Sequence, residues 1–117
     1  IVDNADQAMV DNLGSEMRHH DHFAPAGTNV NFVQILAPSH IHVRTFERGV
    51  GETLACGTGV ATSGMITAYL NDWPSPVKVD VLGGDKLGVA FERIGEKFLN
   101  VLLTGPAVFV YEGTVEV

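Results

Sequence analysis

Residues 56–74 read CGTGVATSGMITAYLNDWP, and this stretch contains a run made almost entirely of small and apolar residues. The spacing predicts a helix over 59–73. It ends there because Pro74 disfavours the α conformation in the residue before it. Apolar or small side chains would line most of the circumference of this helix: Val60, Ala61, Gly64, Met65, Ala68 and Tyr69. A helix that is apolar nearly all round is typically buried, so we expect one helix at the centre of the domain.

Six stretches around this helix have the pattern of β-strands. They occupy residues 29–37, 40–47, 77–82, 86–92, 98–103 and 107–113. In 40–47 successive side chains alternate between two faces of the expected strand. One face carries Ile41, Val43 and Thr45, and the other carries His40, His42, Arg44 and Phe46. The tight-turn sequences GGD and IGEK separate the later strands, which favours antiparallel hairpins.

A second helix is expected over 5–20, where apolar residues recur at roughly helical spacing. Together these elements predict the α+β class. We expect mostly antiparallel β-structure, barrel-like, wrapped around one buried central helix, with an outer amphipathic helix beside it. The chain has 117 residues and contains no repeat, low-complexity segment or linker, so we expect a single domain over 1–117.

Charge and composition exclude several classes of partner. The net charge is −7, and only seven Lys and Arg residues are spread along the chain. Nucleic acids and anionic membrane surfaces are bound by clustered basic residues, so neither is expected here. No apolar run is long enough to cross a bilayer. A lone cysteine cannot form an intramolecular disulfide, which favours a reducing compartment, the cytoplasm.

That cysteine, Cys56, lies in a glycine-containing turn just before the central helix. Backbone N–H groups at a helix start are unpaired and the macrodipole is positive there, which favours a thiolate over a thiol. The N–H groups of Gly57, Thr58 and Gly59 could hold a carboxylate or an oxyanion. A structural role is an equally good interpretation, because a free cysteine often behaves as a small buried hydrophobe.

Glu47 and Arg48 lie shortly upstream of the cysteine. Adjacent opposite charges at a strand end are usually solvated and weakly coupled. As a functional pair they would offer an acceptor for an ammonium and a bidentate donor for a carboxylate, the two charged groups of an amino acid. Asn29 precedes a strand, where asparagine usually bonds its own backbone. Its amide could instead contact the same ligand.

The five histidines raise the question of a metal. His19, His20 and His22 cluster, and His40 and His42 share a strand face. Two histidines on one face could ligate a metal, but no third and fourth ligand follows at a recognised spacing, so no metal is expected. A Cys–His hydrolase pair is also conceivable, although spacing assigns no histidine to the cysteine.

One long match adds to this interpretation. RTFERGVGETLACGTG, residues 44–59, resembles the C-terminal signature of the diaminopimelate epimerase family, cofactor-independent enzymes of the lysine pathway. FAPAGTNVNFV (23–33) resembles the preceding segment of that family, and LTGPAVFVYEG (103–113) resembles its closing segment. Members of the family are longer, with two similar domains and a cleft between them. The resemblance implies that residues 1–117 correspond to the C-terminal half and that the N-terminal half is absent.

The resemblance also implies roles for individual residues. Cys56 would be one of two catalytic thiols that epimerise LL-diaminopimelate to meso-diaminopimelate without a cofactor. Glu47 would accept a hydrogen bond from the distal ammonium of the substrate, and Arg48 would hold the distal carboxylate with help from Asn29. The N–H groups of Gly57 and Thr58 would hold the carboxylate at the reacting carbon.

The implied partners are the amino-acid substrate and the N-terminal half of the same enzyme, and exposed strand edges would allow a homodimer. The isolated chain would be inactive because it lacks the second thiol. Two alternatives remain. One is another PLP-independent isomerase of the same superfamily, such as a proline-racemase-like enzyme, and the other is a non-catalytic domain with a structural Cys56. The pair Glu47–Arg48 favours the epimerase, because only a two-ended amino acid needs its far end recognised.

Overall fold

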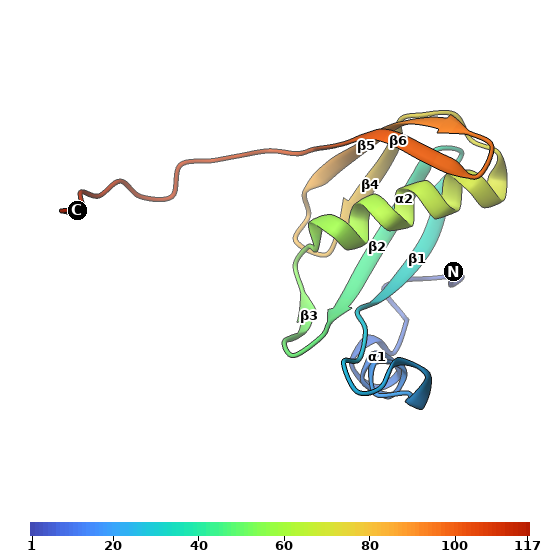
Figure 1. The fold of residues 1–117 in the computed structure, drawn as a ribbon, viewed down its shortest axis with the longest axis horizontal. Coiled ribbons are helices and arrows are strands. Elements are labelled where there is room, and N and C mark those ends of the chain that lie inside the picture. The colour runs from blue at the N-terminus through green and yellow to red at the C-terminus, as the bar shows by residue number, and fades with distance from the viewer.

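The computed structural model describes residues 1–117 as a mixed six-stranded sheet with two α-helices (Figure 1). The strands are β1 (Val30–Ala37), β2 (His40–Glu47), β3 (Gly51–Thr53), β4 (Val77–Val81), β5 (Lys86–Ile94) and β6 (Lys97–Thr104). The helices are α1 (Val10–Arg18) and α2 (Gly57–Asn71), with a short 3₁₀ turn η1 (Asp21–Phe23). The predicted α+β class is confirmed.

The sheet is open and mostly antiparallel. Its order is β1-β2-β4-β5-β6, with β3 paired to β2. Only β2 and β4 run parallel, because the chain between them passes through α2, and parallel neighbours require such a crossover. Since β1 and β6 lie at opposite ends of this order, the sheet does not close into a barrel.

The two faces of the sheet carry separate apolar clusters. The larger cluster lies between α2 and the sheet and includes Val33, Ile41, Val43, Val60, Ala68, Val77, Val79, Val81, Val89 and Phe91. The smaller one lies where α1 packs on the opposite face, and it contains Val10, Val30, Phe32 and Phe46. The alternation predicted for residues 40–47 is confirmed, because Ile41 and Val43 belong to the larger cluster and Phe46 to the smaller one on the other face.

α2 is buried along one side only. Of the six positions expected to be buried, Val60, Gly64 and Ala68 are buried, Ala61 and Met65 are half-buried, and Tyr69 is exposed. Its outer side shows Ile66 at 50% and Leu70 at 62% exposure. Burial all round the helix was therefore a wrong expectation for this chain. The physical reason is that an open sheet covers a helix from one direction.

Both ends of the chain differ from the sequence-based prediction. The first helix begins at Val10 rather than at residue 5, because Asn4 Oδ1 accepts hydrogen bonds from the N–H groups of Asp6 and Gln7 and holds a turn there. The strand expected over 107–113 is absent. Residues 105–117 contain no helix or strand and extend away from the sheet (Figure 1), with Phe109 fully exposed. A strand needs backbone partners, and none lies beside this segment.

Candidate active site

The candidate site lies where the ends of β1, β2 and β3 approach the first turn of α2. Two side-chain hydrogen bonds join the three strands on the α2 side of the sheet. Thr53 Oγ1 donates to Glu47 Oε1 over 2.7 Å, and Thr45 Oγ1 donates to Asn31 Oδ1 over 2.7 Å. The Asn31 amide also packs against the backbone of Gly59, since a Cβ built on that glycine would meet Asn31 Oδ1. Polar groups from three strands and one helix therefore share one corner of the domain.

Cys56 is the N-cap residue of α2, with an extended backbone, and it is 9% exposed. The first hydrogen bond of the helix runs from Val60 N–H to the Cys56 carbonyl over 2.8 Å. The N–H groups of Gly57, Thr58 and Gly59 lie before this first helical donor, so they have no acceptor within the helix. The Cys56 Sγ lies 3.5 Å from Thr58 Oγ1. The thiol thus sits beside a set of donors suited to an anion.

Glu47 and Arg48 are adjacent but do not pair with each other. The half-buried Glu47 carboxylate takes part in no ion pair, and Thr53 is its hydrogen-bond partner. The exposed Arg48 guanidinium makes one long contact, 3.4 Å from Nη1 to the Ala26 carbonyl. Both charges therefore remain available to a ligand rather than neutralising one another.

Asn29 lies beside this pair and bonds a distant part of the backbone, not its own as asparagine usually does before a strand. Its Oδ1 accepts a hydrogen bond from the Arg48 backbone N–H over 2.8 Å. The amide thereby fixes the start of the turn after β2. Asn29 is an exposed residue and its Nδ2 group makes no hydrogen bond within the chain, so it retains its donors for a ligand.

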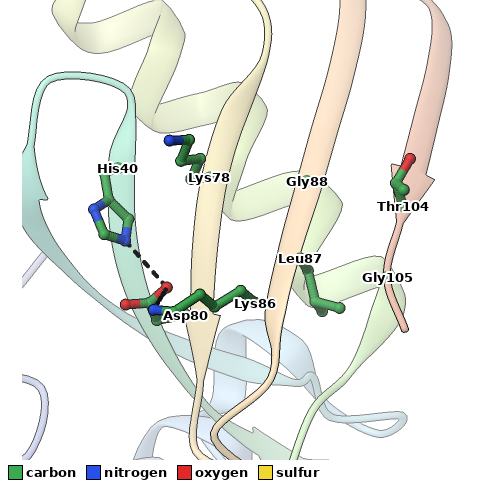
Figure 2. A pocket seen from close by; sticks show the side chains of 8 residues that line it. All are labelled: His40, Lys78, Asp80, Lys86, Leu87, Gly88, Thr104 and Gly105. Carbon is green, nitrogen blue, oxygen red and sulfur yellow. Dashed lines mark hydrogen bonds and ion pairs between the residues drawn. The ribbon is translucent and has the colours of Figure 1, made fainter. Parts of the chain in front are cut away.

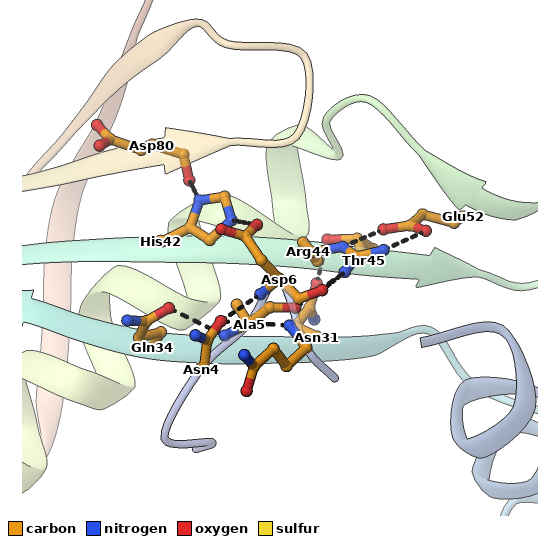
Figure 3. A network of polar contacts seen from close by, with 11 residues as sticks. Asn4, Ala5, Asp6, Asn31, Gln34, His42, Arg44, Thr45, Glu52 and Asp80 are labelled. Atoms are coloured by element: carbon orange, nitrogen blue, oxygen red, sulfur yellow. Dashed lines mark hydrogen bonds and ion pairs between the residues drawn. The ribbon is translucent and has the colours of Figure 1, made fainter. Parts of the chain in front are cut away.

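An Arg–Glu pair on the opposite face holds β3 against β2. Arg44 donates Nε to Glu52 Oε1 at 2.5 Å and Nη2 to Oε2 at 2.8 Å, and Nη1 reaches the carbonyls of Ala5 and Asp6 (Figure 3). The hydrogen bonds with Glu52 raise the pKa of Arg44, although partial burial acts in the other direction. This network ties the N-terminal segment and the β2–β3 hairpin together below the candidate site.

Sequence reasoning missed the residues that support the site: Asn31, Thr45, Glu52 and Thr53. The alternation in 40–47 was a signal for Thr45, because it placed that side chain on the same face as Glu47. Thr53 lies within the matched stretch 44–59, but nothing in the sequence linked its side chain to Glu47. Its contact with Glu47 depends on the β2–β3 register, in which Thr45 pairs with Thr53 and Glu47 pairs with Gly51.

The strand histidines lie on the face opposite α2 and bind carboxylates there. His40 Nε2 is 3.1 Å from Asp80 Oδ1, and His42 Nε2 is 3.1 Å from Asp6 Oδ1. Burial would raise the pKa of Asp80, but hydrogen bonds from His40 and Lys86 outweigh it and hold that pKa below its ordinary value. A groove of about 570 Å³ runs past these side chains (Figure 2). The side-chain hydrogen bond of Cys56 is with Thr58, and none joins it to a histidine, so the structure does not bring together the Cys–His pair considered from the sequence.

Comparison with known proteins supplies the remaining observation. The family model described as diaminopimelate epimerase matches residues 1–110. The chain belongs to the diaminopimelate epimerase family. Diaminopimelate epimerases of Ectopseudomonas mendocina and Pseudomonas aeruginosa are each 44% identical to it over 115 residues, which is 97% of this chain and 40% of each relative. That of Chlorobaculum tepidum is 43% identical over 116 residues, covering 97% of this chain and 44% of the relative.

Membership in the diaminopimelate epimerase family makes this a domain of an isomerase family, as expected from residues 44–59. The chain spans about 40% of the length of the curated relatives it matches. No helix of the domain is both long and apolar enough to span a membrane.

Proposed function

We propose that residues 1–117 form the C-terminal domain of a diaminopimelate epimerase that converts LL-diaminopimelate to meso-diaminopimelate without a cofactor. Family membership supports the reaction class. The observation that carries the assignment to this corner of the domain is Cys56, the sole cysteine, at the N-cap of α2 beside unpaired N–H groups. The proposal places the enzyme in the cytoplasm, where a lone thiol stays reduced.

The proposed chemistry is an exchange of protons at the α-carbon. One thiolate takes the α-proton and becomes a thiol, while a second thiol on the opposite face donates its proton to the carbon and becomes a thiolate. The reverse reaction uses the same two groups with their protonation states exchanged. Cys56 supplies one of them. The chain has no second cysteine, so the other comes from the N-terminal half of the enzyme.

The N–H groups of Gly57 and Thr58 would hold the carboxylate attached to the reacting carbon. Removing the α-proton shifts negative charge onto this carboxylate. Donors that are already aligned stabilise that charge without reorganising, and exclusion of water strengthens the effect. A helix N-terminus provides such donors together with a favourable dipole.

Two residues at the β2–β3 turn, Glu47 and Arg48, together with Asn29 just before β1, would recognise the far end of the substrate. The Glu47 carboxylate would accept a hydrogen bond from the distal ammonium, and the Arg48 guanidinium would bind the distal carboxylate. Asn29 Nδ2 would add a donor. The lack of a Glu47–Arg48 ion pair supports this assignment, because both charges are free to bind opposite groups of one ligand. This recognition favours diaminopimelate over proline, the substrate of a proline-racemase-like isomerase.

The test is substitution of Cys56 by Ala and by Ser in the full-length enzyme. Removing one partner of a general acid–base pair should lower kcat by about a hundredfold to ten-thousandfold, with the fold preserved. Conversion of LL-diaminopimelate to the meso form measures the effect, and unfolding midpoints check the fold. Near-normal turnover by the alanine variant would refute the proposal. Faster conversion of proline than of diaminopimelate by the unmodified enzyme would favour the other isomerase class.

A separate experiment tests the proposal that the two thiols come from two halves of the enzyme. The isolated 117 residues should not exchange the α-proton of diaminopimelate for deuterium in D₂O, because the second thiol is absent. Adding the separately produced N-terminal half should restore exchange if the two halves associate. Exchange by the isolated chain alone would contradict a two-thiol mechanism.

A further inference from the structure

We propose that Thr53 is a positioning residue of the substrate site, which orients the Glu47 carboxylate toward the ammonium group of the ligand. This inference rests on the proposed function. It gives a role to a side chain on β3 for which neither the resemblance of residues 44–59 nor the family name implies one.

The geometry of the β2–β3 hairpin brings the two side chains together. Thr45 pairs with Thr53 and Glu47 pairs with Gly51, so Glu47 and Thr53 are diagonal neighbours on the same face of the hairpin. Thr53 Oγ1 lies 2.7 Å from Glu47 Oε1. An ionised carboxylate only accepts hydrogen bonds, so the hydroxyl of Thr53 is the donor.

Thr53 is the residue that restrains this carboxylate. Gly51, directly opposite Glu47, has no side chain, and a Cβ built there would meet nothing within 4 Å. No Lys or Arg forms an ion pair with Glu47. A glutamate side chain has several rotatable bonds, so a single hydroxyl donor decides which orientation is most populated.

Glu52 shows the contrast within the same hairpin. Both of its oxygens accept hydrogen bonds from Arg44. This ion pair neutralises the charge of Glu52 and holds the two strands together. Glu47 instead keeps Oε2 without a partner, and its one donor is neutral. A half-buried carboxylate with one fixed and one free oxygen is suited to an ammonium ligand, because its negative charge is directed but not neutralised.

The test uses full-length enzyme carrying Thr53→Val, which keeps the shape of the side chain and removes the hydroxyl. We expect KM for diaminopimelate to rise about tenfold, the effect of one net hydrogen bond, with kcat changed less than about twofold. Inhibition by 2-aminopimelate, in which one amino group is replaced by hydrogen, should change less than about twofold. Thr53→Ser should restore the KM of the unmodified enzyme, because serine supplies the same donor.

A control variant and the choice of measured constants separate positioning from a general loss of structure. Thr104→Val makes the same chemical change at an exposed position that lines the groove on the opposite face, and it should leave both constants unchanged. KM and inhibition constants do not depend on the fraction of folded enzyme, so partial misfolding of Thr53→Val does not obscure the result. If the valine variant yields no soluble enzyme, Thr53→Ala replaces it with the same expectations.

The outcomes are distinguishable. An unchanged KM for Thr53→Val, or an equal loss of affinity for diaminopimelate and 2-aminopimelate, would overturn the positioning role while leaving the proposed function intact. Absence of diaminopimelate turnover by the unmodified enzyme would overturn the proposed function, and with it the ligand ammonium that this role requires. A selective rise in KM with rescue by serine would support both.

Discussion

At the scale of single residues, the start of α2 depends on how closely the helix approaches β1. Gly59 lies against the Asn31 amide, whose oxygen is held by the buried hydroxyl of Thr45. A side chain at this position would have to displace a strand residue or tilt the first turn of the helix. Because Gly59 has no Cβ, the start of α2, with Cys56 and the N–H donors, can lie this close to the sheet.

We expect Gly59→Ala to destabilise the protein. Alanine favours a helix by about 1 kcal/mol over glycine, but overpacking against Asn31 should cost more, leaving a net loss of about 1–2 kcal/mol. Urea unfolding of the substituted protein measures this change. Gly88→Ala, on β5, is the control for adding a methyl group without overpacking, since a Cβ there would meet nothing within 4 Å. A more stable Gly59→Ala protein would show that the helix start can shift freely.

At the scale of elements, β3 is a strand of three residues, and its Thr53 donates a hydrogen bond to Glu47 of the candidate site. So short a strand has few ladder hydrogen bonds of its own. The Arg44–Glu52 pair compensates by joining β3 to β2 with two charge-assisted bonds, and the same arginine reaches the carbonyls of Ala5 and Asp6. The position of the Glu47–Arg48 turn therefore depends on a contact made on the other face of the sheet.

Arg44→Met should destabilise the protein by about 2–3 kcal/mol, because it leaves the Glu52 carboxylate, 15% exposed, without its partner. The double substitution Arg44→Met with Glu52→Gln should recover part of the loss, since it removes the unpaired charge. Chemical denaturation of the two single variants and the double variant gives the coupling. Strictly additive losses would mean that the pair does not act as a unit.

At the scale of the whole molecule, the chain carries a net charge of −7, and its acidic groups govern how stability depends on pH. Asp80 lies on the central strand β4, on the face of the sheet opposite α2, and is within 3.3 Å of both His40 and Lys86. The ordinary pKa of this carboxyl is 3.8, and the folded protein holds it lower. The unfolded chain therefore binds this proton first as the pH falls.

Because the unfolded chain is protonated first, protonation of Asp80 favours unfolding as the pH falls. Ionised Asp80 contributes stability above its ordinary pKa, and that contribution is lost as the pH falls through its lower pKa in the folded state. Asp80→Asn should consequently lower the unfolding midpoint at neutral pH and make stability decline less steeply below about pH 4. Unfolding midpoints measured from pH 2 to pH 7 test this. Asp3→Asn, at an exposed residue with no ion pair, should keep the slope of the unmodified protein.

Much of the fold was predictable from local patterns. The alternation in 40–47 assigned each side chain of β2 to the correct face, and Pro74 marked the end of the central helix within a few residues. The segment 107–113 shows the limit of such patterns. Its run of apolar, β-branched and aromatic residues is typical of a strand. A strand forms only where another backbone offers hydrogen bonds, and this chain offers none there.

The candidate site likewise depends partly on local sequence and partly on contacts made only in the folded chain. The sequence by itself determined the α+β class, the family and the residues with chemical reactivity or charge, Cys56, Glu47 and Arg48, because residue type and spacing carry that information. Only the tertiary structure decided that Glu47 and Arg48 do not pair, that Thr53 holds Glu47, and that Asn31 lies under the first turn of α2. Those relations depend on strand register and on the distance between helix and sheet. Both are set by packing between residues far apart in the chain, and no local pattern encodes them.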